Sequence, residues 1–148
     1  MDTPEKNFVL VIDASEEILK LVKMRIDMLA NNIKILGETD IENAQYIFNS
    51  CHETLKAVFV GSGITSFTLK KVTEPATLGF IREVHASGWD KPLVGFSGNP
   101  DFCIQMYGAG CTRIFSHKGY IVEEIVEALR NHDVIDFDAK NTKESTAI

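Results

Sequence analysis

The sequence predicts an α/β domain in which helices cover both faces of a five-stranded parallel sheet. Five short runs rich in Val, Ile and other apolar residues have the length of strands, and segments with helical spacing of apolar positions separate them. The run at residues 8–12 is apolar at every position, as expected of a strand buried on both faces. Strands that alternate with helices pair in parallel through right-handed crossovers, so the sheet is doubly wound.

The first strand and helix are marked at both ends. Residues 8–12 end at Asp13, and Ser15 is placed to cap a helix whose first turn carries two glutamates at the positive end of the helix dipole. Apolar positions then recur at helical spacing until the pair Asn31 and Asn32. This segment predicts one strand and one helix of about four turns.

The middle of the chain repeats the pattern with a longer connection. Residues 33–38 predict a second strand, and Asp40 can cap the helix that follows. Residues 57–60 predict a third strand, which the Gly61-Ser62-Gly63 triplet ends. Residues 61–73 have no clean period and predict a long loop.

The second half contains three shorter helices and two strands. Pro75 is expected near the first turn of the third helix, where its missing N–H costs nothing, and Gly88 ends that helix. The remaining elements are a strand at 92–97, a helix at 101–109 that stops at Gly110, a strand at 112–115, and a last helix with Ile121, Val122, Ile125, Ala128 and Leu129 on its buried side. These elements predict a domain over residues 1–132 and a polar, partly disordered tail over residues 133–148.

Composition excludes several classes of function. The chain has 148 residues, which is enough for one domain with a sizeable core, and a net charge of −6, which disfavours binding to nucleic acid. Its apolar runs are strand-sized, and its first residues carry no export signal, so neither a membrane span nor secretion is expected. Three cysteines without metal-type spacing indicate reduced thiols in a cytoplasmic protein.

Polar and small residues follow the strands where a doubly wound sheet carries its functional crevice. They are Asp13-Ala14, Gly61-Ser62, Ser97-Gly98 and Ser116-His117-Lys118. With the segments 9–13, 92–97 and 107–112, the chain resembles the receiver domains of two-component response regulators over roughly residues 8–131. The resemblance implies a CheY-like, flavodoxin-like fold with strand order 2-1-3-4-5.

The resemblance also implies a cluster of acidic residues at the strand ends, here called the acid pocket. This sequence has only part of that cluster. A working receiver has two acidic residues after the first strand and an aspartate after the third, which hold Mg²⁺, and the third-strand aspartate takes the phosphoryl group. Asp13 matches the first acidic position, but Ala14 occupies the second. Gly61, or Ser62 if the register slips by one, stands at the phosphoacceptor position. We therefore expect a pseudo-receiver without phosphorylation on aspartate, with no cofactor and no Mg²⁺ site, for which Asp13 alone is a weak candidate.

The two remaining receiver positions are a hydroxyl after the fourth strand and a lysine after the fifth. Ser97 matches the hydroxyl. A gapless count places His117 at the lysine position and Ile114 at the aromatic switch position, whereas a gap of one residue places Lys118 and Phe115 there. Both registers remain open from the sequence, and phosphotransfer on another acid is disfavoured because residues 61–73 contain no Asp or Glu.

The expected function is signal transduction by contact with other proteins, without enzymatic activity. By resemblance, a signalling partner or a second copy would bind the face formed by the fourth helix, fifth strand and fifth helix. The candidate residues of that face are Phe102, Met106, Ile114, Phe115, Tyr120 and Glu124. The alternative is a small-ligand or anion-binding module that uses the former active-site crevice around Gly61, Ser62, Ser97, His117 and Lys118.

Overall fold

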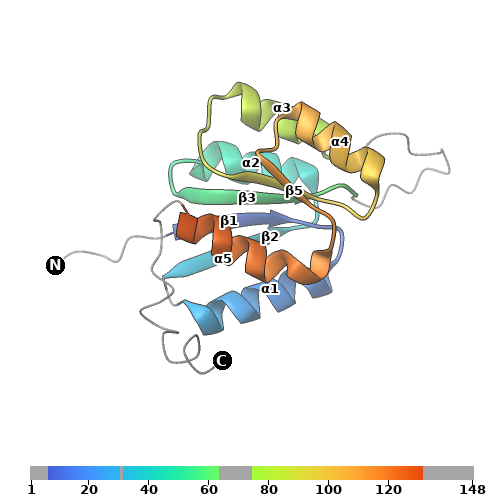
Figure 1. Cartoon of the computed structure of the whole chain (residues 1–148). Helices are drawn as coiled ribbons and strands as arrows, with labels where there is room; N and C mark the ends of the chain where they lie inside the picture. The colour runs from blue at the N-terminus through green and yellow to red at the C-terminus, as the bar shows by residue number, and fades with distance from the viewer. Residues whose placement is uncertain (1–6, 31, 64–74, 132–148) are drawn as a thin grey trace.

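The computed structural model describes residues 7–30, 32–63 and 75–131 and confirms the expected fold class. Its elements are β1 (Asn7–Ile12), α1 (Glu16–Leu29), β2 (Ile33–Glu38), α2 (Ile41–Cys51), β3 (Leu55–Gly61), α3 (Leu78–Ala86), β4 (Leu93–Phe96), α4 (Pro100–Ala109), β5 (Arg113–Phe115), a short 3-10 helix η1 (Lys118–Tyr120) and α5 (Ile121–Asn131). The five strands pair in parallel in the order β2-β1-β3-β4-β5 (Figure 1). This is the order that the resemblance to receiver domains implies.

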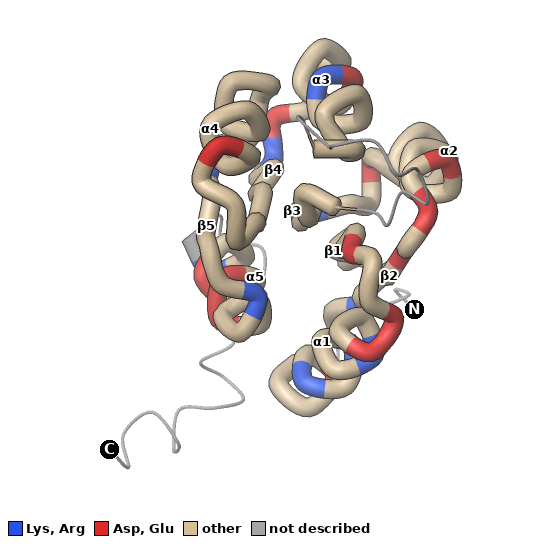
Figure 2. Tube along the Cα trace, turned by 90° about the vertical axis from the view of Figure 1, so that its right-hand side faces the viewer, with Lys and Arg blue, Asp and Glu red and all other residues tan. Residues whose placement is uncertain are grey.

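The sheet has a hydrophobic core on each face. One core packs α1 and α5 against alternate residues of the strands, and the other packs α2, α3 and α4 against the opposite side chains. Figure 2, which looks along the strands, shows β5 to β2 in succession between these two layers of helices. Every side chain from Val9 to Asp13 is buried, so β1 lies at the centre of the domain. None of the described helices is long and apolar enough to cross a membrane.

Side-chain caps fix where three of the helices begin. Ser15 Oγ accepts a hydrogen bond from the N–H of Ile18 at the start of α1, and Asp40 Oδ1 accepts one from the N–H of Glu42 at the start of α2, as the sequence predicts. Asn99 caps α4 by accepting from two backbone N–H groups. Because a cap satisfies N–H groups that have no partner within the helix, each fixes the residue at which the chain leaves its strand-end loop.

Several element boundaries differ by one or two residues from the sequence-based expectation, and two differences have a clear tertiary cause. β3 runs from Leu55 to Gly61, so Gly61 belongs to the strand instead of ending it. Pro75 is buried in a turn before Thr77, the N-cap of α3, and does not lie in the first helical turn. Tertiary contacts decide both cases, because Gly61 pairs with Phe96 on β4 and the Thr77 hydroxyl donates to the Gly61 carbonyl at 2.7 Å. Most of the predicted 61–73 loop and the whole predicted 133–148 tail lie outside the described residues.

Cys111 is expected to resist thiol reagents while the protein is folded. It is buried beside Gly95 of β4, and burial raises the pKa of its thiol from 9.0 to about 12. Almost no thiolate is therefore present at neutral pH, and a thiol reagent should titrate the half-buried Cys51 and Cys103 but reach Cys111 only on unfolding. Rapid modification of all three thiols in the native protein would contradict this.

The same shift in the pKa of Cys111 predicts a pH dependence of stability. The contribution of the neutral thiol is complete below the pKa of the unfolded state and is lost as the pH rises from about 9 towards 12. A Cys111→Ala variant should lack this alkaline component when free energies of unfolding are compared across that range.

Candidate functional site: the strand ends around Asp13

Asp13 lies at the carboxyl end of the central strand and is 1% exposed. β1 pairs with β3 so that Ile12 lies opposite Val60, which places Asp13 and Gly61 side by side at the next position of the two strands. Ser97 follows β4 at the same edge of the sheet, and residues 116–118 follow β5. The structure thus brings together the four strand ends that the sequence predicts to converge.

The Asp13 carboxylate is held by partners on both oxygens. Lys118 Nζ lies 2.8 Å from Oδ1, and the backbone N–H of Ser15 donates to Oδ2 at 3.0 Å. The Lys118 side chain is 48% exposed, so this ion pair joins a buried carboxylate to a cation that still contacts water. Burial of a carboxylate is costly unless it is paired and hydrogen-bonded, and both conditions are met here.

Gly61 leaves the space beside this carboxylate free of a second side chain. A Cβ at Gly61 would lie 3.2 Å from Asp13 Oδ1, 3.1 Å from a ring carbon of Phe96 and 3.3 Å from the Ile12 carbonyl oxygen. The position is therefore tight even for a methyl group. The fully buried hydroxyl of Thr77 donates a hydrogen bond to the Gly61 carbonyl and so fixes its position. No sequence pattern predicted this role of Thr77.

The other small residues of the site serve the local backbone. Ala14 is half-buried and offers no ligand atom. The backbone N–H of Ser62 donates to the Phe96 carbonyl, which shows that the chain continues along β4 for one residue past the strand end. Ser97 Oγ accepts a hydrogen bond from the N–H of Asn99 at 3.1 Å, so this hydroxyl supports the turn into α4.

Lys118, and not His117, lies against Asp13. The His117 side chain is exposed, and its ring contacts Tyr120 edge-on with the centroids 6.1 Å apart. Phe115 lies three residues before Lys118, at the end of β5. Phe115 is 9% exposed and stacks on Phe96 with ring centroids 5.2 Å apart.

The residues present do not fit the Mg²⁺ site of a working receiver. Among the described residues no three His, Cys, Asp or Glu side chains are grouped so that they could hold a metal ion. Asp13 is a single carboxylate, and Lys118 already neutralises it. Since Mg²⁺ gives up its hydration shell reluctantly and is held by carboxylates together with phosphate oxygens, one paired carboxylate is a poor site.

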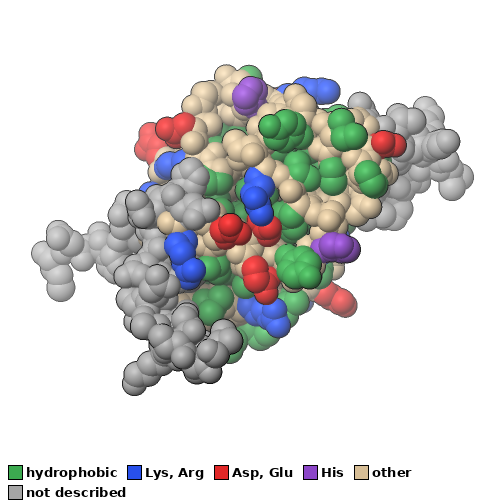
Figure 3. Space-filling model, viewed as in Figure 1, with side chains coloured by type: hydrophobic (Ala, Val, Ile, Leu, Met, Phe, Trp, Pro, Cys, Tyr) green, Lys and Arg blue, Asp and Glu red, His purple; other side chains and the backbone are tan. Residues whose placement is uncertain are grey.

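An apolar groove of about 560 Å³ begins beside Ser97 and runs between α4, β5 and the start of α5. Ile104 and Tyr120, which are 71% and 61% exposed, line it together with Ile114, Phe115 and His117. Figure 3 shows hydrophobic side chains gathered over α4 on this face of the molecule. Exposed apolar groups grouped in this way mark a contact surface more often than isolated ones do.

A clamp between two charged residues borders the groove. Arg113 Nε and Nη2 donate to the two carboxylate oxygens of Glu124 at 2.7 and 2.9 Å, which joins β5 to α5. The hydrogen bond and charge of Glu124 raise the pKa of Arg113 above its usual value. These two hydrogen bonds fix the position of Glu124, the acidic residue that lines the groove.

One of the residues expected on this face needs correction. Met106 is wholly buried, and its methyl group would lie 2.9 Å from a Cβ at Gly95, so it belongs to the core. Phe115 is 9% exposed and lines the groove, and Phe102 is half-buried. Ile104 was missed, although the apolar residues on all sides of this short helix were a signal that one apolar face would remain exposed.

Solved structures with this fold include receiver domains. The receiver domain of a response regulator from Clostridium thermocellum matches with a TM-score of 0.65 and 14% identity, over 86% of this chain and 98% of that one. A response regulator from Thermotoga maritima matches with a TM-score of 0.61 and 18% identity, over 84% and 98% of the two chains. The chemotaxis response regulator CheY4 of Vibrio cholerae matches with a TM-score of 0.62 and 12% identity, over 84% and 99%.

At identities this low the likeness establishes the fold alone. The chain is an α/β domain with the CheY-like, flavodoxin-like fold found in receiver domains. No family model matches the sequence. No curated protein matches it either.

Proposed function

We propose that this chain is a receiver-like signal-transduction domain that is not phosphorylated on aspartate and acts by protein–protein contact. The observation that carries the proposal is the composition of the acid pocket. By the resemblance to receivers, Gly61 or Ser62 stands at the phosphoacceptor position, and Lys118 neutralises the single remaining carboxylate, Asp13. An acyl phosphate needs a carboxylate nucleophile and a divalent cation, and the pocket supplies neither in usable form.

Treatment with acetyl phosphate and Mg²⁺ is expected to leave the protein unmodified. The measurement is intact-protein mass, followed by a test for a hydroxylamine-labile phosphoryl group. A variant with both missing carboxylates restored, Ala14→Asp with Gly61→Asp, is the matched control if circular dichroism shows that it folds. Phosphoaspartate on the unaltered protein would overturn the proposal.

The partner is expected to bind the groove between α4, β5 and α5. Ile104 is the most exposed apolar side chain that lines the groove, and Tyr120 lies across from it on the 3-10 turn. Apolar anchors that enter such a groove usually provide most of the binding energy. Cross-linking in cell extract should capture proteins that Ile104→Glu loses and that Tyr46→Glu retains, because Tyr46 is 73% exposed but lies on α2. Equal capture by both variants would contradict this surface.

A second candidate function is a small-ligand module in this groove, which shares only Ser97 and His117 with the crevice expected from the sequence. The groove's volume of about 560 Å³ lies within the range of ligand sites. An anion is the less suitable ligand because Lys118 is engaged by Asp13 and Glu124 adds negative charge to the lining. Resonance shifts at Ile104 and Tyr120 on addition of a small apolar compound, with none on addition of nucleotide, would favour this function.

A further inference from the structure

Helix α1 carries a second apolar surface that faces away from the sheet. Its inner side buries Leu19, Val22 and Ile26. On its outer side Leu21, Met24 and Met28 are 41%, 55% and 70% exposed. Positions 21, 24 and 28 fall on one face of a helix with 3.6 residues per turn, so these three side chains form a continuous row, here called the α1 stripe.

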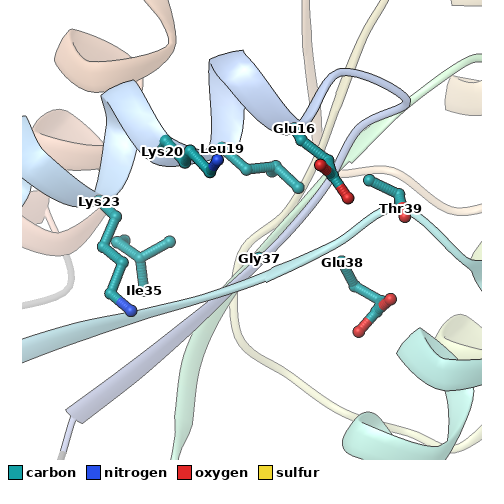
Figure 4. A pocket seen from close by; sticks show the side chains of 8 residues that line it. All are labelled: Glu16, Leu19, Lys20, Lys23, Ile35, Gly37, Glu38 and Thr39. Carbon is teal, nitrogen blue, oxygen red and sulfur yellow. The ribbon is translucent and has the colours of Figure 1, made fainter.

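Charges of both signs border one edge of the α1 stripe. Lys20 and Asp27 line a shallow hollow of about 440 Å³ together with Met24 and Met28, which places both charged side chains on the same edge. Lys23 also lines this hollow, and Figure 4 shows its side chain extending past Ile35 towards β2. Lys20 and Asp27 are the residues of opposite charge that line the hollow on either side of Met24 along the helix.

The order of these charges along α1 is self-complementary. Lys20 lies four residues before Met24 and Asp27 lies three residues after it, which is about 6 Å and about 4.5 Å along the axis at 1.5 Å per residue. A two-fold axis through Met24, perpendicular to the helix, would place Lys20 of one copy beside Asp27 of a second copy. The same operation repeats the pair on the other side of the axis.

We propose that the α1 stripe is a homodimer surface in which α1 packs antiparallel against α1 of a second copy. Leu21 of each copy then lies beside Met28 of the other, with Met24 at the two-fold axis. The flexible methionine side chains can fill the contact without exact shape matching. A single pair of helices buries less area than a standard stable interface, so the dimer is weak and dissociates in the micromolar range or above. This surface is separate from the groove between α4, β5 and α5.

The proposal predicts that reversing a charge far from the two-fold axis weakens the dimer, whereas removing the charge next to the axis strengthens it. Lys20→Glu and Asp27→Lys should each weaken the dimer about tenfold, because each turns two attractions into two repulsions. The double variant, Lys20→Glu with Asp27→Lys, should restore it. Arg25, one residue from Met24, meets its own copy across the axis, so Arg25→Gln should tighten the dimer. A partner helix with acidic flanks would instead bind Arg25→Gln less well.

Sedimentation equilibrium of the full chain, from micromolar to millimolar concentration, is the test. We expect a monomer–dimer equilibrium that Met24→Glu abolishes and that Ile104→Glu and Tyr46→Glu leave in place. A monomer at all concentrations overturns the proposal, and so does a dimer that Ile104→Glu abolishes and Met24→Glu does not. Failure of the folded charge-swapped double variant to recover dimerisation would also overturn it.

Discussion

Replacement of Gly61 by aspartate is expected to lower the free energy of unfolding by about 3 to 5 kcal/mol, the cost of a buried charge that has no cation of its own. The new Cβ would already lie 3.2 Å from Asp13 Oδ1 and 3.1 Å from the Phe96 ring. The added carboxylate would face a carboxylate whose cation, Lys118, is shared between the two. Two carboxylates at one buried site cannot both remain ionised without cost.

The charge and the size of the new side chain can be separated. Gly61→Asn adds the same volume without the charge and should cost about 1 to 3 kcal/mol, as expected for overpacking. The difference between the two variants should shrink as the pH falls towards the pKa of an ordinary carboxyl group, about 4, because the carboxyl with the raised pKa takes up a proton in the folded state. Urea titrations at several pH values measure this. A Gly61→Asp protein as stable as the parent would show that the pocket is roomier than described.

Removal of the ammonium group in Lys118→Met is expected to lower the free energy of unfolding by about 2 to 3 kcal/mol, at or just below the lower limit of what a broken, fully buried pair costs. The reason is that Asp13 is 1% exposed, and among the described residues the backbone N–H of Ser15 would be the only remaining hydrogen-bond partner of its carboxylate. Water that reaches the half-exposed end of the Lys118 side chain can replace part of the lost interaction. Thermal or urea unfolding at neutral pH gives the value.

The reverse change should cost less. In Asp13→Asn the amide oxygen can still accept from the Ser15 N–H, and the half-exposed Lys118 ammonium can be hydrated, so about 1 kcal/mol is expected. The double variant should then be close to Asp13→Asn alone, since no buried charge remains. Additive effects of the two single variants would contradict a direct pair.

The fold was largely predictable because each strand and cap has a local cause. The apolar run at residues 8–12, the caps at Ser15 and Asp40, and the glycines at positions 88 and 110 all lie where the pattern indicates. The boundaries that differed depend on distant contacts. The hydrogen bond from the Thr77 hydroxyl to the Gly61 carbonyl joins residues 16 positions apart, and no local sequence pattern predicts it.

The candidate site was predictable only as far as parallel strands determine it. Parallel strands bring Asp13, Gly61 and Ser97 to the same edge of the sheet, independently of the conformations of the loops. The choice between His117 and Lys118 depends on the short 3-10 turn after β5, which no count of residues resolves. Met106 was misplaced because α4 has apolar residues on all sides, so its period does not show which side faces the core.

The ion pair between Lys118 and Asp13 also affects the neighbouring groove between α4, β5 and α5. Lys118 begins the 3-10 turn that also carries Tyr120, so the pair anchors one wall of the groove to the buried end of β1. In a domain whose pocket gains and loses a charged group, such a wall can adopt two positions. In the function proposed above, Lys118 keeps the Asp13 charge balanced and this wall has one position. On that proposal a surface of constant shape transmits the abundance of its protein and of its partner, so its output would follow synthesis and degradation instead of a reversible chemical mark.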